Sequence, residues 1–115
     1  MAGSFREINA DDFDDIIAEG IVLAEFWLPL SHPCLIQDPV LNDICRELGD
    51  QLRIIRVNAE DVPELKKKYD IRAVPTFLLF QNGREAKRFV GVKSKDSLLG
   101  AIDDLLFGKK KQTEI

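Results

Sequence analysis

The segment IVLAEFWLPLSHPC, residues 21–34, decides the fold, because it joins a buried strand to the start of a helix. Residues 21–27 form a nearly continuous apolar run, short enough to be a strand that is buried on both faces. Glu25 interrupts this run with a carboxylate, which calls for an explanation. A loop follows, and apolar residues at helical spacing begin at about Cys34.

The helix that begins near Cys34 is expected to run to Leu48, with Gly49 ending it. Pro39 lies inside this pattern and is expected to kink the helix, because proline lacks a backbone N–H and its ring clashes with the preceding turn. The apolar face of the helix is predicted to comprise Ile36, Val40, Leu41, Ile44, Cys45 and Leu48.

Strands and helices alternate on both sides of this unit. Apolar spacing predicts three further helices, at residues 11–19, at residues 61–69 and after Ser94, which is expected to cap the last one. Strands are predicted at residues 52–57, 76–81 and 85–90, after an extended stretch at residues 5–8. Asn82-Gly83 is typical of a tight hairpin turn. This order predicts an α/β domain whose mixed sheet has parallel core strands, an antiparallel hairpin and helices on both faces.

Length and composition bound the architecture. The 115 residues, of which 45% are apolar, suffice for one buried core. We therefore expect one domain over residues 1–108 and a flexible basic tail over residues 109–115. The formal net charge is −4, from 16 basic and 20 acidic residues, which offers no positive field for a phosphate backbone. Nucleic acid is not an expected partner.

The lack of a recognisable targeting signal and the small number of cysteines predict a cytoplasmic protein without a membrane span. No run approaches the roughly 18–20 apolar residues that cross a bilayer, and residues 1–6 lack the pattern of a signal peptide. Cys34 and Cys45 are too few for the disulfide framework of a secreted domain. His32 is the only histidine, and one histidine beside one cysteine cannot form a zinc site unless two chains share the metal. No metal or cofactor is expected.

Several short motifs together resemble the thioredoxin family. They occur in the family's order and spacing over nearly the whole chain: Ala24-Glu25-Phe26-Trp27, Ser31-His32-Pro33-Cys34, Pro39, Ala73-Val74-Pro75-Thr76, Asn82-Gly83 and Val90-Gly91. Each motif alone is weak evidence, but all agree with the strands and helices expected above. The resemblance implies the thioredoxin fold and a role in thiol–disulfide exchange and cell redox homeostasis.

The resemblance also identifies a departure from the family. In the family a Cys-x-x-Cys motif opens this helix; the first cysteine attacks a substrate disulfide and the second resolves the mixed disulfide. Ser31 stands at the attacking position and Cys34 at the resolving one. Dithiol reductase activity is therefore expected to be lost or limited to one-cysteine chemistry at Cys34, which leaves open whether the chain is an enzyme. A natural variant and a replaced cysteine in a Cys-His-Pro-Cys site would share this sequence.

The two cysteines are not expected to pair. Eleven residues apart on one helix, at ~1.5 Å per residue, they would lie roughly 16 Å apart. A disulfide needs Cα atoms within about 7 Å. Cys45 is interpreted as a small buried hydrophobe. Two interpretations of Cys34 stay open: a silent thiol, or a reactive thiol favoured by the helix N-terminus and by neighbouring His32.

Two further features have family roles that the resemblance implies. Glu25 matches an acid that shuttles a proton to or from the second cysteine, and burial would raise its pKa; alternatively, its carboxylate reaches water from the strand end. Pro75 matches a cis-proline that presents a backbone edge to an extended substrate peptide. The implied substrate groove comprises Trp27, His32, Pro33, Val74, Pro75 and Gly91.

The resemblance implies protein or peptide substrates, a reductant of the thioredoxin-reductase or glutathione type, and a monomer. The alternative function is a redox-silent peptide-binding or chaperone module, because chaperedoxin-type proteins also place Ser-x-x-Cys on a thioredoxin domain. Those proteins carry a helical repeat extension, which is not seen in this sequence. A chaperone of this kind needs an exposed apolar patch larger than the groove.

Overall fold

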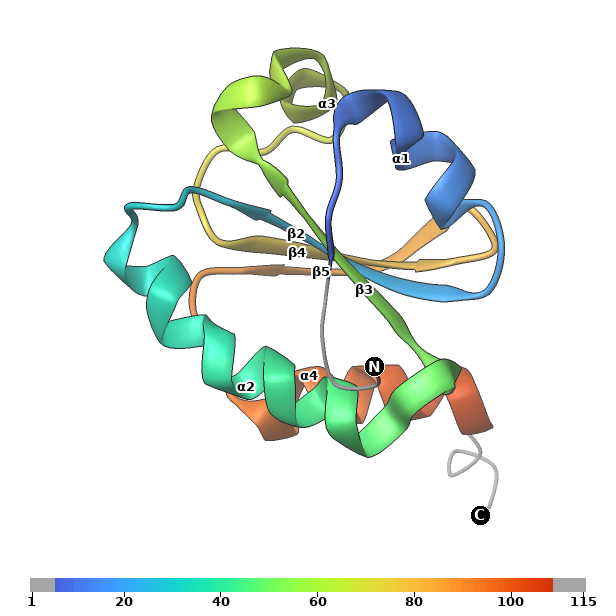
Figure 1. Cartoon of the computed structure of the whole chain (residues 1–115). Coiled ribbons are helices and arrows are strands. Elements are labelled where there is room, and N and C mark those ends of the chain that lie inside the picture. Colours follow the sequence, from blue (N-terminus) through green and yellow to red (C-terminus); the bar gives the residue numbers. More distant parts are fainter. Residues whose placement is uncertain (1–5, 109–115) are drawn as a thin grey trace.

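The computed structural model describes residues 6–108, which contain a five-stranded sheet (Figure 1). Its strands are β1 (Arg6–Glu7), β2 (Ile21–Trp27), β3 (Arg53–Asn58), β4 (Thr76–Gln81) and β5 (Arg84–Val90). Their order across the sheet is β1-β3-β2-β4-β5. β3 pairs in parallel with β1 and β2, whereas β4 pairs antiparallel with β2 and β5. The predicted mixed sheet is confirmed.

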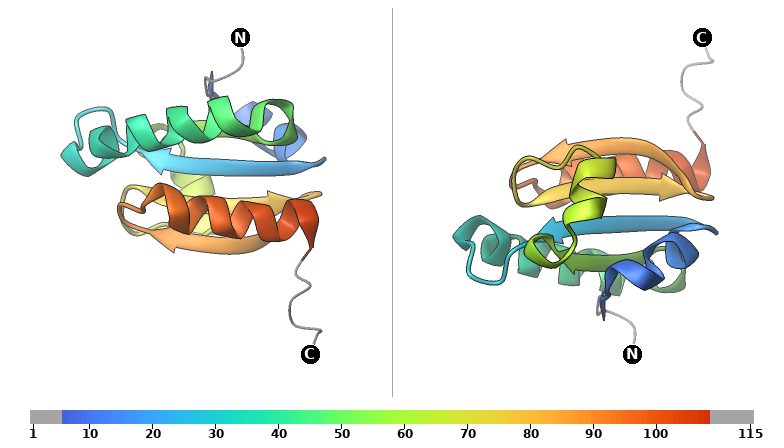
Figure 2. Two further views of the ribbon diagram at one scale, coloured as in Figure 1. Left: turned by 90° about the horizontal axis from the view of Figure 1, so that it is seen from below. Right: turned by 90° about the horizontal axis from the view of Figure 1, so that it is seen from above.

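Helices cover both faces of this sheet, as predicted. Among the described residues the α-helices are α1 (Ala10–Ile17), α2 (His32–Leu48), α3 (Pro63–Lys68) and α4 (Lys95–Phe107), with short 3-10 helices at Gly49–Gln51 and Ala59–Asp61. α1 and α3 lie on one face and α2 and α4 on the other (Figures 1 and 2). The expected tail at residues 109–115 lies outside the described residues.

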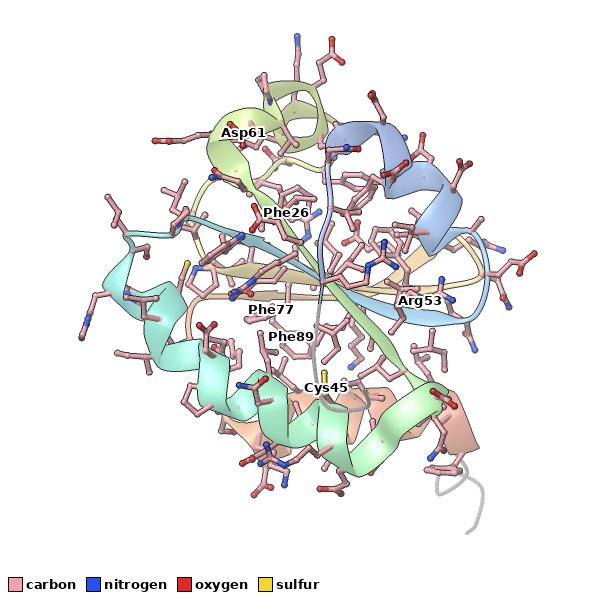
Figure 3. The ribbon with its side chains drawn as sticks, in the orientation of Figure 1. Phe26, Cys45, Arg53, Asp61, Phe77 and Phe89 are labelled. Carbon is pink, nitrogen blue, oxygen red and sulfur yellow. The ribbon has the colours of Figure 1, made fainter. Side chains whose placement is uncertain are left out.

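β2 is buried on both faces, as its apolar run predicts, and it separates two hydrophobic cores. On one face Phe26 packs against Phe13 of α1, with ring centroids 6.0 Å apart. On the other face Leu23 belongs to a core that contains residues of α2 and α4. Phe77 of β4 belongs to this second core, so it and Phe26 point to opposite sides of the sheet (Figure 3). This double burial fixes the strand that leads into α2.

α2 begins directly after Ser31 because this serine caps it. Ser31 has an extended backbone, and its Oγ accepts a hydrogen bond from the N–H of Cys34 at 3.4 Å. Pro33 lies in the first turn, where its missing N–H removes no helical hydrogen bond. The helix therefore begins before Cys34, earlier than the apolar pattern predicts, and continues past Pro39.

The predicted apolar face of α2 is wrong at one position. Ile36 is 50% exposed, whereas the next residue, Gln37, is fully buried. Gln37 lies about one turn before Leu41 and two turns before Ile44, which are both buried. The buried face of the first turns is therefore occupied by an amide rather than by an isoleucine.

The hairpin between β4 and β5 turns at Asn82-Gly83, as predicted. Both residues have positive φ, 50° and 87°, which asparagine and glycine tolerate. Asn82 also bonds to Gly20: the Gly20 N–H donates to Oδ1 of Asn82 at 2.9 Å, and the Asn82 N–H donates to the Gly20 carbonyl at 2.9 Å. The hairpin is thereby tied to the turn between α1 and β2.

β5 forms one edge of the sheet and is exposed along most of its length. Its pairing with β4 changes register beside Leu79 and Phe80, an irregularity typical of a β-bulge. The charged residues of this strand are Arg84, Glu85, Lys87 and Arg88.

Candidate active site at the start of helix α2

The first turn of α2 carries the residues that the sequence singles out. His32 and Pro33 are exposed, Ser31 is partly buried, and Cys34 is fully buried with a free thiol. Backbone N–H groups and the helix dipole favour negative charge at this end. Because Ser31 already bonds the N–H of Cys34, the serine acts as a helix cap in this structure.

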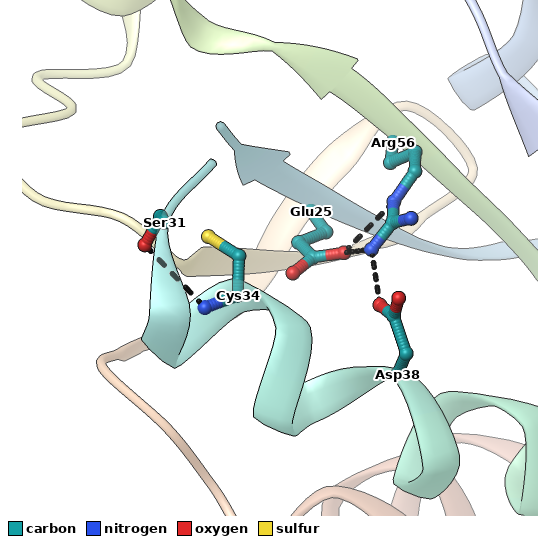
Figure 4. A network of polar contacts seen from close by, with 5 residues as sticks. All are labelled: Glu25, Ser31, Cys34, Asp38 and Arg56. Carbon is teal, nitrogen blue, oxygen red and sulfur yellow. Dashed lines mark hydrogen bonds and ion pairs between the residues drawn. The ribbon is translucent and has the colours of Figure 1, made fainter. Parts of the chain in front are cut away.

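Glu25 is fully buried on β2, so the alternative of a carboxylate that reaches water is wrong. Its Oε1 accepts two hydrogen bonds from Arg56 of β3, from Nε at 3.2 Å and from Nη2 at 2.8 Å. The two residues are direct partners in the parallel pair of β2 and β3. Asp38 of α2 contacts the same guanidinium, with Oδ1 2.7 Å from Nη2 (Figure 4). One buried cation therefore joins two carboxylates.

Opposing influences set the protonation of Glu25. Burial raises its pKa, the charge and hydrogen bonds of Arg56 lower it, and the negative charge of Asp38 raises it; the result is a pKa of about 7. Burial lowers the pKa of Arg56, but Glu25 and Asp38 outweigh this effect and raise that pKa above its usual value. Glu25 can therefore gain or lose a proton near neutral pH, which suits proton transfer.

Glu25→Gln is expected to change stability in a pH-dependent way. Because the pKa of Glu25 rises from 4.5 to about 7, the folded protein keeps a proton that the unfolded chain has released between these values. The stability from this group is fully present below pH 4.5 and is lost as the pH rises through 7. Glutamine keeps an oxygen for Arg56 without the charge. The variant should match the parent at pH 5 and exceed its free energy of unfolding by on the order of 2 kcal/mol at pH 8.

Urea unfolding of both proteins at the two pH values measures this difference. Glu25→Asp is the matched control, because it keeps a titrating carboxylate on the same strand. A loss of stability in Glu25→Gln at pH 8 would instead indicate that the charged form is the one the fold favours.

Trp27, at the end of β2, packs against the same guanidinium. Cζ of Arg56 lies 3.6 Å from the centroid of the indole ring, which is a cation–π contact. Within residues 6–108, the buried side-chain polar atoms without a hydrogen-bond partner are Nε1 of Trp27 and Oε2 of Glu25. Both atoms belong to this site, so the charged network and the buried indole form one packed unit.

Neither Arg56 nor Asp38 is predicted from the sequence. Arg56 interrupts the expected strand at residues 52–57 much as Glu25 interrupts residues 21–27, and this pair of opposite charges in neighbouring strands is the signal that could have found it. Asp38 follows Cys34 by four residues, which places it one turn along the same helix face.

Three of the predicted groove residues meet around the start of β4. The Val74–Pro75 peptide bond is cis, and Pro75 is buried. The carbonyl of Pro75 accepts a hydrogen bond from the N–H of Gly91 at 2.8 Å, and Gly91 has a φ of +89°, which favours glycine. Val74 and Leu28 line one shallow pocket, and Leu28 and Ser31 line a second. Leu28, in the loop before α2, therefore borders both pockets.

Gln37 fixes the chain that follows Gly91 to α2. Its Nε2 donates to the carbonyl of Lys93 at 2.8 Å, and the N–H of Lys93 donates to its Oε1 at 2.9 Å. The side chain that makes both bonds has no exposed surface. A single glutamine in a helix carries no functional signal in the sequence, so this anchor is found only in the structure.

Gln37→Leu is expected to lower the free energy of unfolding by about 2 kcal/mol, because it leaves two backbone groups of Lys93 without partners. The amide of Lys93 should also exchange its hydrogen faster. Urea unfolding and NMR hydrogen exchange measure the two effects. Gln81→Leu, at an exposed position, is the control and should change stability by less than about 0.5 kcal/mol. Parental exchange at Lys93 in Gln37→Leu would contradict the anchoring role.

Cys45 lies in the core that α2 and α4 form with the sheet, and burial raises the pKa of its thiol. Its interpretation as a small buried hydrophobe is confirmed. In the described part of the chain, no cluster of three or more His, Cys, Asp or Glu side chains is arranged to hold a metal ion. No helix there has the length and apolar character needed to cross a membrane.

Comparisons with known proteins agree with this geometry. A family model described as thioredoxin matches residues 4–104. The thioredoxin of Chlamydia caviae is 38% identical over 98 residues, which cover 85% of this chain and 95% of that protein. The thioredoxin of Bacillus subtilis is 37% identical over 81 residues, or 70% of this chain and 78% of that protein.

Solved structures give the same result. The crystal structure of thioredoxin from Malassezia sympodialis matches with a TM-score of 0.79 and 29% identity, covering 90% of this chain and 92% of that chain. A mutant thioredoxin from Halobacterium salinarum matches with a TM-score of 0.80 at 22% identity, over 90% of this chain and 93% of that one, which supports the fold. From its matched residues, its relatives and its sheet, this chain belongs to the thioredoxin family.

Proposed function

We propose that this protein engages protein or peptide partners at the start of α2, as a monomer, but does not complete the two-thiol cycle of disulfide reduction. The observation that carries the proposal is Ser31, which caps α2 three residues before Cys34. Membership of the thioredoxin family supports thiol–disulfide exchange as the chemistry. A hydroxyl can cap a helix, but it cannot become half of a disulfide.

The chemistry left to the chain is one-cysteine exchange at Cys34. The thiol loses its proton, the thiolate attacks a disulfide, and a new S–S bond forms between Cys34 and one half of that disulfide. The other half leaves as a thiolate and takes up a proton. No net reduction occurs until a second thiol, from glutathione or a reductase, cleaves the new bond. Glu25, with its pKa of about 7, is the group suited to exchange the proton.

The burial of Cys34 limits this chemistry further. The thiol has no exposed surface, so small disulfides such as oxidised glutathione should react before folded protein disulfides do. The shielded position favours slow exchange over rapid turnover. The groove that the resemblance implies would present Val74, Pro75 and Gly91 to an extended peptide beside the helix start, while Trp27 is buried against Arg56.

The test of this proposal is reduction of a disulfide-bonded test protein by dithiothreitol. The purified chain should not accelerate the reaction above background, and Cys34→Ser should behave in the same way. Intact-mass analysis after exposure to oxidised glutathione should find one adduct, at Cys34, that Cys34→Ser lacks. Substantial turnover by protein whose mass confirms Ser31 would show that Cys34 attacks protein disulfides directly.

A redox-silent peptide-binding or chaperone module is the second candidate. It is favoured by exposed apolar side chains at the loop and first turns of α2 and after Gly91: Leu30, Leu35, Ile36 and Val92. Cys34→Ser separates the two functions, since it abolishes one-cysteine exchange and leaves an apolar binding surface intact. If this variant still suppresses aggregation of an unfolding test protein, the module is the better description.

A further inference from the structure

A single nitrogen of Arg56 bridges two carboxylates from different elements. Its Nη2 lies 2.8 Å from Oε1 of Glu25 on β2 and 2.7 Å from Oδ1 of Asp38 on α2 (Figure 4). Asp38 lies one turn after Cys34 on the same helix. The helix that carries the thiol is therefore tied to the buried acid through one guanidinium.

The three charged side chains differ in their access to water. The side chain of Asp38 is 32% exposed, that of Arg56 is 9% exposed, and that of Glu25 has no exposed surface. An ion pair between two exposed side chains contributes little to stability. Here the cation is buried, where water weakens the attraction less. Asp38 is therefore the outermost member of a network that is otherwise shielded from solvent.

The guanidinium is also held by an aromatic ring, because it packs 3.6 Å from the centroid of Trp27. A planar group with carboxylates on two sides and a ring against its face cannot turn without losing a contact. We propose that Asp38 is a positioning residue, which holds Arg56 against Glu25 and Trp27 and thereby controls when Glu25 carries a proton. Any effect of Asp38 on thiol exchange at Cys34 rests on the function proposed above.

The groups around Glu25 can be named from each neighbouring element. Arg56 comes from β3, Asp38 comes from α2, and the uncharged Phe77 is the partner of Glu25 on β4. Cys34, with its thiol, lies on the first turn of α2 (Figure 4). The charge of Asp38 opposes that of Arg56 at Glu25. Removing the negative charge of Asp38 while keeping Arg56 in place should therefore lower the pKa of Glu25.

The test compares two variants of Asp38 with a matched control. Asp38→Asn removes the charge but keeps an oxygen that can accept from Arg56, whereas Asp38→Leu removes both. Asp43→Asn removes an acidic charge from the same helix, where Asp43 pairs with exposed Arg46. The two readouts are an NMR titration of the Glu25 carboxyl carbon and the fluorescence of Trp27, the only tryptophan.

Asp38→Asn should lower the titration midpoint of Glu25 by about 0.5–1 pH unit and keep the parental Trp27 emission. Asp38→Leu should change the emission, because Arg56 loses its outer anchor, and Asp43→Asn should change neither readout. An unchanged or raised midpoint in Asp38→Asn, or parental emission in Asp38→Leu, would overturn the proposal.

Circular dichroism establishes that each variant is folded. If Asp38→Leu does not fold, Asp38→Ala takes its place in the fluorescence measurement, because alanine also removes the outer anchor of Arg56. Both readouts work without thiol exchange, so a result against the positioning role of Asp38 is distinct from a result that Cys34 is inert.

Discussion

Ser31→Cys is expected to turn this chain into a working disulfide reductase. The new thiol would stand at the N-cap of α2, where the helix dipole and backbone N–H groups favour a thiolate. Cys34, three residues on, would resolve the mixed disulfide, and Glu25 would exchange the proton. Reduction of a test disulfide protein should rise above background by on the order of tenfold or more.

The redox midpoint of the new pair gives a second readout. In glutathione buffers it should be somewhat more oxidising than that of a Gly-Pro pair, because His32, between the two cysteines, can donate a hydrogen bond that stabilises the thiolate of the reduced form. Ser31→Ala is the matched control, since it loses the cap without gaining a thiol and should cost about 1 kcal/mol of stability with no gain in activity. If Ser31→Cys oxidises readily yet reduces nothing, the peptide-binding module should replace the redox function.

Arg56→Met is expected to destabilise the fold by more than Gln37→Leu or Ser31→Ala does. It removes the cation that pairs with Glu25 and keeps a long side chain to pack against Trp27. At pH 8 the buried Glu25 would either keep its charge without a partner or bind a proton that the unfolded chain has released, at a cost of about 3–5 kcal/mol. Losing Arg56 also raises the pKa of Glu25 further, so the destabilisation should shrink as the pH falls toward 5 and the carboxylate is protonated.

Urea unfolding across this pH range measures the effect. Arg53→Met is the matched control, because Arg53 lies on the same strand but is exposed, and its guanidinium donates a hydrogen bond to the carbonyl of Ile16 rather than to a buried acid. The double variant Arg56→Met with Glu25→Gln should recover most of the stability that Arg56→Met loses, because it has no unpaired buried carboxylate. If Arg56→Met lowers the free energy of unfolding by less than about 1 kcal/mol at pH 8, or by the same amount at every pH, the ion pair between Arg56 and Glu25 does not stabilise the fold.

Features that depend on neighbouring residues can be predicted from the sequence. The apolar run of β2 predicts its double burial, and Asn82-Gly83 predicts the hairpin. Ser94 caps α4 as expected, with its Oγ accepting from the N–H of Ser97 at 3.1 Å. Each of these depends on a few consecutive side chains, so the local pattern is enough.

Features that depend on contacts between distant segments are not predicted by such local patterns. Ile36 and Gln37 are adjacent, and which of them is buried depends on what packs against the first turns of α2, including the backbone of Lys93. The pairing of Glu25 with Arg56 depends on the register of two strands that are far apart in the sequence. The candidate acid is therefore predicted from the sequence, whereas its contacts with Arg56, and those of Arg56 with Asp38, are established by the structure.

The edge strand β5 bears on how the protein behaves when it is concentrated. Its outer N–H and C=O groups are a template on which a strand from another molecule could pair, the first step of aggregation. Four of its seven residues are charged, and its register with β4 is irregular. A second copy of β5 that paired with this edge would bring together two strands that each carry three basic residues and one acidic residue, and it would meet a distorted ladder. The composition of β5 therefore opposes fibril growth from this side of the sheet.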